Sequence, residues 1–138
     1  MIGPNLIIPG PQTQKDIAIR SLKDPGTAYD DPVLGQDPQP KHMKDYVYTL
    51  QDDGGVHINS GIPNHAFYLI ATQLGGYAWQ TVGPIWYQCL CSPQLSKSAG
   101  FRDFARLTLY MAQTMYPKLN SPVQAAIQQG WAQVGIYV

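Results

Sequence analysis

The chain has few charged residues. Only 13% of its 138 residues are Asp, Glu, Lys or Arg, about half the usual share, and nine basic residues balance nine acidic ones. Without a net charge or a basic patch, the sequence argues against nucleic acid and against an anionic membrane surface as partners. It also lacks an apolar run long enough to span a membrane and a signal pattern at its N-terminus. So few charges on a small domain indicate that another surface covers part of it.

Cysteine is also scarce. The only two, Cys89 and Cys91, are separated by one residue, a spacing that rarely permits a relaxed disulfide. No further ligands follow at the spacing of a zinc site. We therefore expect two free thiols on or near a helix, and neither a metal site nor a cofactor in this chain.

Proline divides the sequence into two parts within one expected domain, residues 1–138. Seven of the twelve prolines lie within the first 40 residues. Because proline removes a backbone donor and restricts φ, we predict a loop-rich segment over residues 1–59. From Ser60 onward, apolar residues recur at the three- and four-residue spacing of helices, which predicts a helical bundle over residues 60–138. The fold class is therefore mainly α, a compact bundle of about four to five helices with a loop-rich N-terminal third.

One short stretch, DDGGVHINSG at residues 52–61, is a candidate functional motif. A lone histidine is more often structural than catalytic, but Asp52 lies five residues before His57, across the pair Gly54-Gly55. Glycine lets the chain fold back sharply, so we expect the carboxylate within hydrogen-bond reach of the ring. That contact would fix the tautomer and favour the charged imidazolium, leaving the second nitrogen as a donor for a developing oxyanion.

The same stretch is part of a longer resemblance. DDGGVHINSGIPNHAFYLIA resembles the signature around the catalytic histidine of thermolysin-like zinc metallopeptidases. AIRSLKDPGTAYDDPVLGQDPQPKHMKDYV resembles the segment upstream of that signature, particularly in the protealysin-like branch, and GGYAWQTVGPIWYQCL and FRDFARLTLYMAQTMYP resemble helices of the C-terminal domain. The resemblance covers nearly the whole chain and implies that it is the C-terminal domain of such an enzyme.

The resemblance implies a role for each of four residues. His57 would donate a hydrogen bond to the oxyanion of the tetrahedral intermediate, and Asp52 would orient it. Arg20 would hold the substrate carbonyl just beyond the scissile bond, and Ile19 would form an aliphatic wall of the pocket for the following side chain. From the residues alone, Arg20 could equally form a surface ion pair and Asp52 a turn. His42 and His65 match no catalytic position, and we expect both to be exposed.

The sequence also departs from the family pattern. The family holds zinc with two histidines of an HExxH helix and a further glutamate, and this chain contains no HExxH. In addition, Pro4 stands where the family has a calcium-binding glutamate, which speaks against calcium there. We expect the C-terminal lobe without the zinc lobe, inactive by itself, with zinc bound only in the full-length enzyme. The family further implies bacterial origin and secretion, although the chain itself carries no sign of its compartment.

Two interpretations of the function remain open. One is the C-terminal lobe of a secreted zinc metalloendopeptidase, whose partners would be a peptide or protein substrate and the N-terminal zinc lobe. The other is a stand-alone, non-catalytic module that binds peptides or proteins. In either case a surface shaped for another lobe would be apolar, so we expect self-association as a homodimer through the exposed cleft face. The isoleucines of that face are Ile7, Ile8, Ile17 and Ile19.

Overall fold

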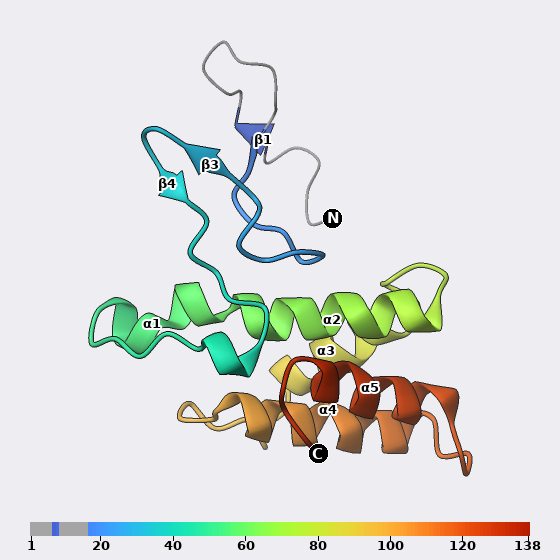
Figure 1. Cartoon of the computed structure of the whole chain (residues 1–138). Coiled ribbons are helices and arrows are strands. Elements are labelled where there is room, and N and C mark those ends of the chain that lie inside the picture. The colour runs from blue at the N-terminus through green and yellow to red at the C-terminus, as the bar shows by residue number, and fades with distance from the viewer. Residues whose placement is uncertain (1–6, 9–16) are drawn as a thin grey trace. The chain divides into compact units, whose positions relative to one another are not determined.

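A computed structural model describes residues 7–8 and 17–138 of the chain (Figure 1). The chain divides between His65 and Ala66 into two compact units. The boundary falls inside helix α2 (Gly61–Leu74), which begins at the last residue of the DDGGVHINSG motif. Pro4 lies outside the described residues, and so do the side chains of Ile7, Ile8 and Ile17.

The first unit is rich in loops, as the proline content predicts. Two two-stranded antiparallel sheets precede a 3₁₀ helix and a short α-helix; these elements are β1 (Ile7–Ile8) with β2 (Ile17–Ala18), β3 (Asp30–Asp31) with β4 (Gly35–Gln36), η1 (Met43–Asp45) and α1 (Asp52–Asn59). A buried carboxylate orders these loops. Asp37 accepts hydrogen bonds from the backbone N–H groups of Gly26, Ala28 and Gln39 at 2.9–3.1 Å, which replaces the backbone pairing that the loops lack.

The second unit contains the end of α2 and the helices α3 (Val82–Leu90), α4 (Phe101–Met115) and α5 (Pro122–Gln133), and α4 packs against both α3 and α5 (Figure 1). Proline at the first position of α5 is favourable because that N–H needs no partner. The core centres on the fully buried Trp131, whose ring stacks on Trp86 at 5.7 Å. Its indole N–H donates to the buried hydroxyl of Thr108 at 2.8 Å.

The predicted fold class, mainly α with four to five helices, is confirmed: the described residues form five α-helices. The predicted start of the helical part at Ser60 is wrong by one element, because α1 already covers Asp52–Asn59. Four consecutive residues of α1 have positive φ, so its first half has no right-handed helical periodicity. A pattern of apolar spacing therefore could not reveal it.

Candidate functional site

The site begins with a left-handed turn. Asp52, Asp53, Gly54 and Gly55 have φ values of 54°, 47°, 84° and 76°. Asp tolerates this region better than most residues, at a cost on the order of 1 kcal/mol each. Gly55 is required here for a second reason, since an added Cβ would lie 2.9 Å from the side-chain nitrogen of Asn59. Strained backbone of this kind gathers at functional sites.

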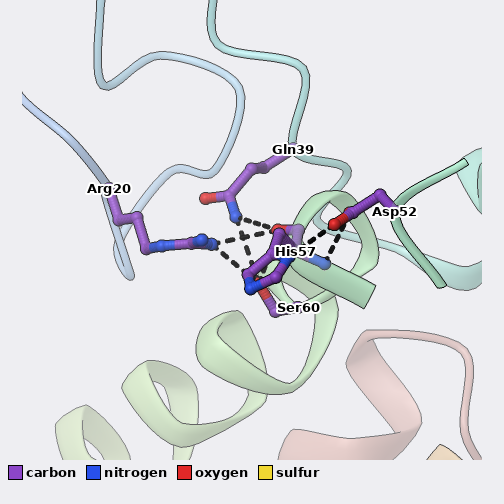
Figure 2. Close-up of polar contacts among 5 residues, drawn as sticks. All are labelled: Arg20, Gln39, Asp52, His57 and Ser60. Carbon is purple, nitrogen blue, oxygen red and sulfur yellow. Dashed lines mark hydrogen bonds and ion pairs between the residues drawn. The ribbon is translucent and has the colours of Figure 1, made fainter. Parts of the chain in front are cut away.

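The turn brings the carboxylate of Asp52 back onto His57, as the sequence predicted. Its Oδ1 lies 2.5 Å from Nδ1 of the His57 ring, and its Oδ2 accepts the backbone N–H of His57 at 2.9 Å (Figure 2). The hydrogen bond from the His57 ring lowers the pKa of the Asp52 carboxyl from its ordinary value of 3.8. The carboxylate therefore stays ionised, and it holds His57 through both the backbone N–H and the imidazole ring of that residue.

The other nitrogen of the ring is available to a ligand. The side chain of His57 is 74% exposed, and no described residue forms a hydrogen bond with its Nε2. With Nδ1–H bonded to a carboxylate, Nε2 is an acceptor in the neutral ring and a donor in the imidazolium. In its imidazolium form the ring can thus present an N–H to a negatively charged ligand atom.

Arg20 approaches His57 from the side opposite Asp52 (Figure 2). Its Nη1 donates to the backbone carbonyl of His57 at 3.0 Å and to the hydroxyl of Ser60 at 2.8 Å. This carbonyl lies in the last turn of α1, where carbonyls lack helical partners and carry partial negative charge. Nε and Nη2 of Arg20 make no hydrogen bond with described residues, so these two donors are available to an acceptor atom of a ligand.

Sequence reasoning missed three residues of this site. Gln39 donates through Nε2 to the carbonyl of His57 at 2.7 Å and to Ser60 at 3.2 Å, and the Ser60 hydroxyl donates to the same carbonyl at 2.7 Å. Asn59 is buried and pairs its amide with both backbone groups of Val47 at 2.9 Å. Gln39 carried no local signal, because it lies 18 residues from His57.

Ile19 adjoins Arg20 in the chain and is 45% exposed. This position is open to a ligand, and its role as a pocket wall stays a prediction. The expectation that His42 and His65 are exposed is wrong, because both are half-buried. His42 accepts the N–H of Lys44 as the cap of η1, and Nδ1 of His65 lies 3.1 Å from the carbonyl of Leu22. Both are structural partners of the loops.

Both cysteines are free thiols, as predicted. Cys89 is buried on α3, and burial raises the pKa of its thiol to about 12. Cys91 follows the end of α3 and is exposed. A buried neutral thiol behaves as a small apolar residue, so Cys89 belongs to the core and takes no part in the site.

Within the described ranges, no group of three or more His, Cys, Asp or Glu side chains could hold a metal ion. The described part of the chain therefore does not fit zinc on its own, and its site supplies hydrogen-bond donors. No helix in this part is both long enough and apolar enough to cross a bilayer.

Comparison with known proteins decides the family. The model of the thermolysin metallopeptidase α-helical domain matches residues 1–136. The chain belongs to this family. It is 48% identical over its whole length to an extracellular metalloprotease of Pectobacterium carotovorum, of which it covers 38%. A solved structure of the precursor of protealysin, a metalloproteinase from Serratia proteamaculans, matches 86% of the chain with a TM-score of 0.80 and 55% identity, and the match covers 36% of that structure.

These matches confirm the resemblance to thermolysin-like enzymes and the helical C-terminal domain. A more distant relative, 31% identical, is named a zinc metalloproteinase from Listeria monocytogenes. The chain spans little more than a third of the Pectobacterium relative and of the protealysin precursor. The relatives are metalloproteases, and their activity belongs to proteins much longer than the part matched here.

Proposed function

We propose that this chain acts as the C-terminal domain of an extracellular zinc metalloendopeptidase. His57 donates from Nε2 to the oxyanion that forms on the scissile carbonyl, and Asp52 orients the ring. Arg20 binds the next backbone carbonyl of the substrate, beside the pocket wall formed by Ile19. The observation that carries the proposal is the 2.5 Å contact between Asp52 and a His57 ring whose second nitrogen is exposed.

The geometry suits a transition state better than a ground state. A peptide carbonyl carries little charge until the tetrahedral intermediate forms, whereas an imidazolium donor gains most from a full negative charge. The ionised Asp52 orients the ring, and its second nitrogen remains exposed to such a charge. A guanidinium is a rigid set of donors that fits a planar carbonyl, so Arg20 would align the peptide before the reaction begins.

Zinc and the general base of the family lie outside these roles. The sequence contains no HExxH, and the described residues form no metal cluster. We therefore propose that zinc is bound by another part of the whole enzyme and that this chain alone does not hydrolyse peptides. The names of the extracellular relatives support secretion of the whole protein.

A chimaera tests the proposal. This chain would replace the matching segment of the protealysin precursor, to which it is 55% identical, and peptide cleavage would be measured after purification. We expect His57→Ala to lower kcat by about 10²- to 10³-fold, the cost of one oxyanion donor. Arg20→Lys should raise KM, because lysine lacks the planar set of donors. His42→Ala is the matched control and should leave kcat unchanged.

Two outcomes would decide against the proposal. A kcat that is the same for His57→Ala and for the unsubstituted chimaera would show that His57 does not stabilise the reaction. A chimaera that folds and binds zinc but cleaves nothing, while still binding peptides through Arg20, would favour the non-catalytic binding module.

A further inference from the structure

The backbone carbonyl of His57 receives an unusual number of donors. Nη1 of Arg20, Nε2 of Gln39 and the hydroxyl of Ser60 all point to this one oxygen, at 3.0, 2.7 and 2.7 Å (Figure 2). A carbonyl oxygen has two lone pairs, so three donors are more than its satisfaction requires. The surplus indicates that the position of this carbonyl matters more than its solvation.

The other peptide group of His57 is fixed as well. Its N–H donates to Oδ2 of Asp52 at 2.9 Å, and the same carboxylate holds the ring. Asp52 therefore anchors the N-terminal side of His57, and the side-chain donors anchor the C-terminal side. Neither anchor alone would set the direction of Nε2, because the ring moves with the backbone that carries it.

The orientation of the Gln39 side chain leaves one of its buried polar atoms unpaired. It is only 6% exposed, and its Oε1 is buried without a hydrogen-bond partner in the described structure. Rotating the amide would bring Oε1 against the His57 carbonyl, two acceptors facing each other, so the donor contacts define its orientation. An apolar side chain of the same size would avoid the unpaired atom. Such an apolar side chain would, however, lose the hydrogen bonds that Gln39 donates to the His57 carbonyl and to Ser60.

We propose that Gln39 and Ser60 are positioning residues that hold Arg20 and His57 in a fixed relation. Ser60 accepts from Arg20 and from Gln39 and donates to His57, so it joins the two groups into one unit. This inference rests on the proposed function for its role in catalysis. The link itself, which is the chain of hydrogen bonds from Arg20 through Ser60 to His57, is present in this protein regardless of that role. The result is a fixed spacing between the donor for the oxyanion and the donor for the next carbonyl of the substrate.

Nuclear magnetic resonance on the 138-residue chain tests the link without requiring activity. The guanidinium protons of Arg20, assigned with Arg20→Lys, and the Nδ1 proton of His57 are the two signals. In Gln39→Met and Ser60→Ala we expect the Arg20 Nη1 protons to exchange about tenfold faster, roughly the factor that one hydrogen bond provides. The His57 proton should broaden in both variants. Ser60→Thr, which keeps the hydroxyl, should restore both signals.

The controls separate positioning from folding. Gln124 donates to the Tyr116 carbonyl at 2.7 Å outside this cluster, so Gln124→Met removes the same type of bond and should leave both signals unchanged. Gln39→Met also removes the unpaired Oε1, so we expect it to unfold at no lower urea concentration than the wild type. Unchanged Arg20 and His57 signals in folded Gln39→Met and Ser60→Ala would overturn the inference.

Kinetics of the chimaera then connect the link to catalysis. Gln39→Met should lower kcat by about tenfold, as expected for a fraction of an ångström of misplacement, with a smaller change in KM. If the signals change but even His57→Ala leaves kcat unaltered, the proposed function fails and the link stands. If His57→Ala lowers kcat and Gln39→Met changes neither the signals nor kcat, the link fails and the proposed function stands.

Discussion

Asn59 joins the end of α1 to the loop that precedes it. Its side chain is 1% exposed, donates to the carbonyl of Val47 and accepts the N–H of Val47, both at 2.9 Å. Asn59→Ala would leave both half-buried backbone groups of Val47 without this partner. Each lost hydrogen bond costs about 1 kcal/mol, and more where water cannot enter. We therefore expect the free energy of unfolding to fall by about 2 to 3 kcal/mol.

Urea unfolding followed by circular dichroism would measure this change. With a slope near 2 kcal/mol per molar urea, the midpoint should fall by about 1 M or slightly more. Asn59→Asp is the sharper variant, because it keeps the acceptor but places a carboxylate oxygen against the Val47 carbonyl, and it should be destabilised at neutral pH. Asn64→Ala on α2, whose side chain makes no hydrogen bond with described residues, is the control. A loss below about 0.5 kcal/mol for Asn59→Ala, the size of a surface change, would refute the reasoning.

Two further predictions concern the same unit. The pKa of Asp52 is lowered by the His57 hydrogen bond, so the pair stabilises the folded state above pH 3.8 and loses this contribution as the pH falls through the lowered pKa. The stability difference between wild type and Asp52→Asn should shrink below that pH in urea titrations, and a difference that stays constant into strong acid would contradict the assignment. The exposed Ile19 and the low charge content support the prediction of self-association; Ile19→Asp should weaken it in sedimentation experiments, and a wild-type chain that stays monomeric at high concentration would disprove it.

The Asp52–His57 contact could be predicted because it is local. The two residues lie only five positions apart in the chain, and the Gly54-Gly55 pair between them allows the positive φ that brings their side chains together. Helix positions were predictable for the same reason. Pro122 begins α5, and the apolar spacing after Ser60 anticipates α2. Such features depend on the preferences of neighbouring residues, which the order of residues displays directly.

The resemblance assigned Arg20 to the same site as His57, but only the tertiary structure shows which atoms hold the Arg20 side chain in place. Arg20 lies 37 residues from His57, and Gln39 lies 18 residues from it. No periodicity relates positions that far apart. Their meeting depends on the buried Asp37, which orders the loops between them, and on Gly61, where a Cβ would lie 2.4 Å from the Pro40 carbonyl.

By itself, the sequence determined the class of fold, the local Asp52–His57 pair and the absence of an HExxH motif. Each of these follows from residue type and short spacing. The tertiary structure decided which polar side chains gather on the His57 carbonyl, and it buried Cys89 and half-buried His65. Burial and long-range hydrogen bonds are collective properties of the packed chain, because each depends on every segment that excludes water from the atom concerned.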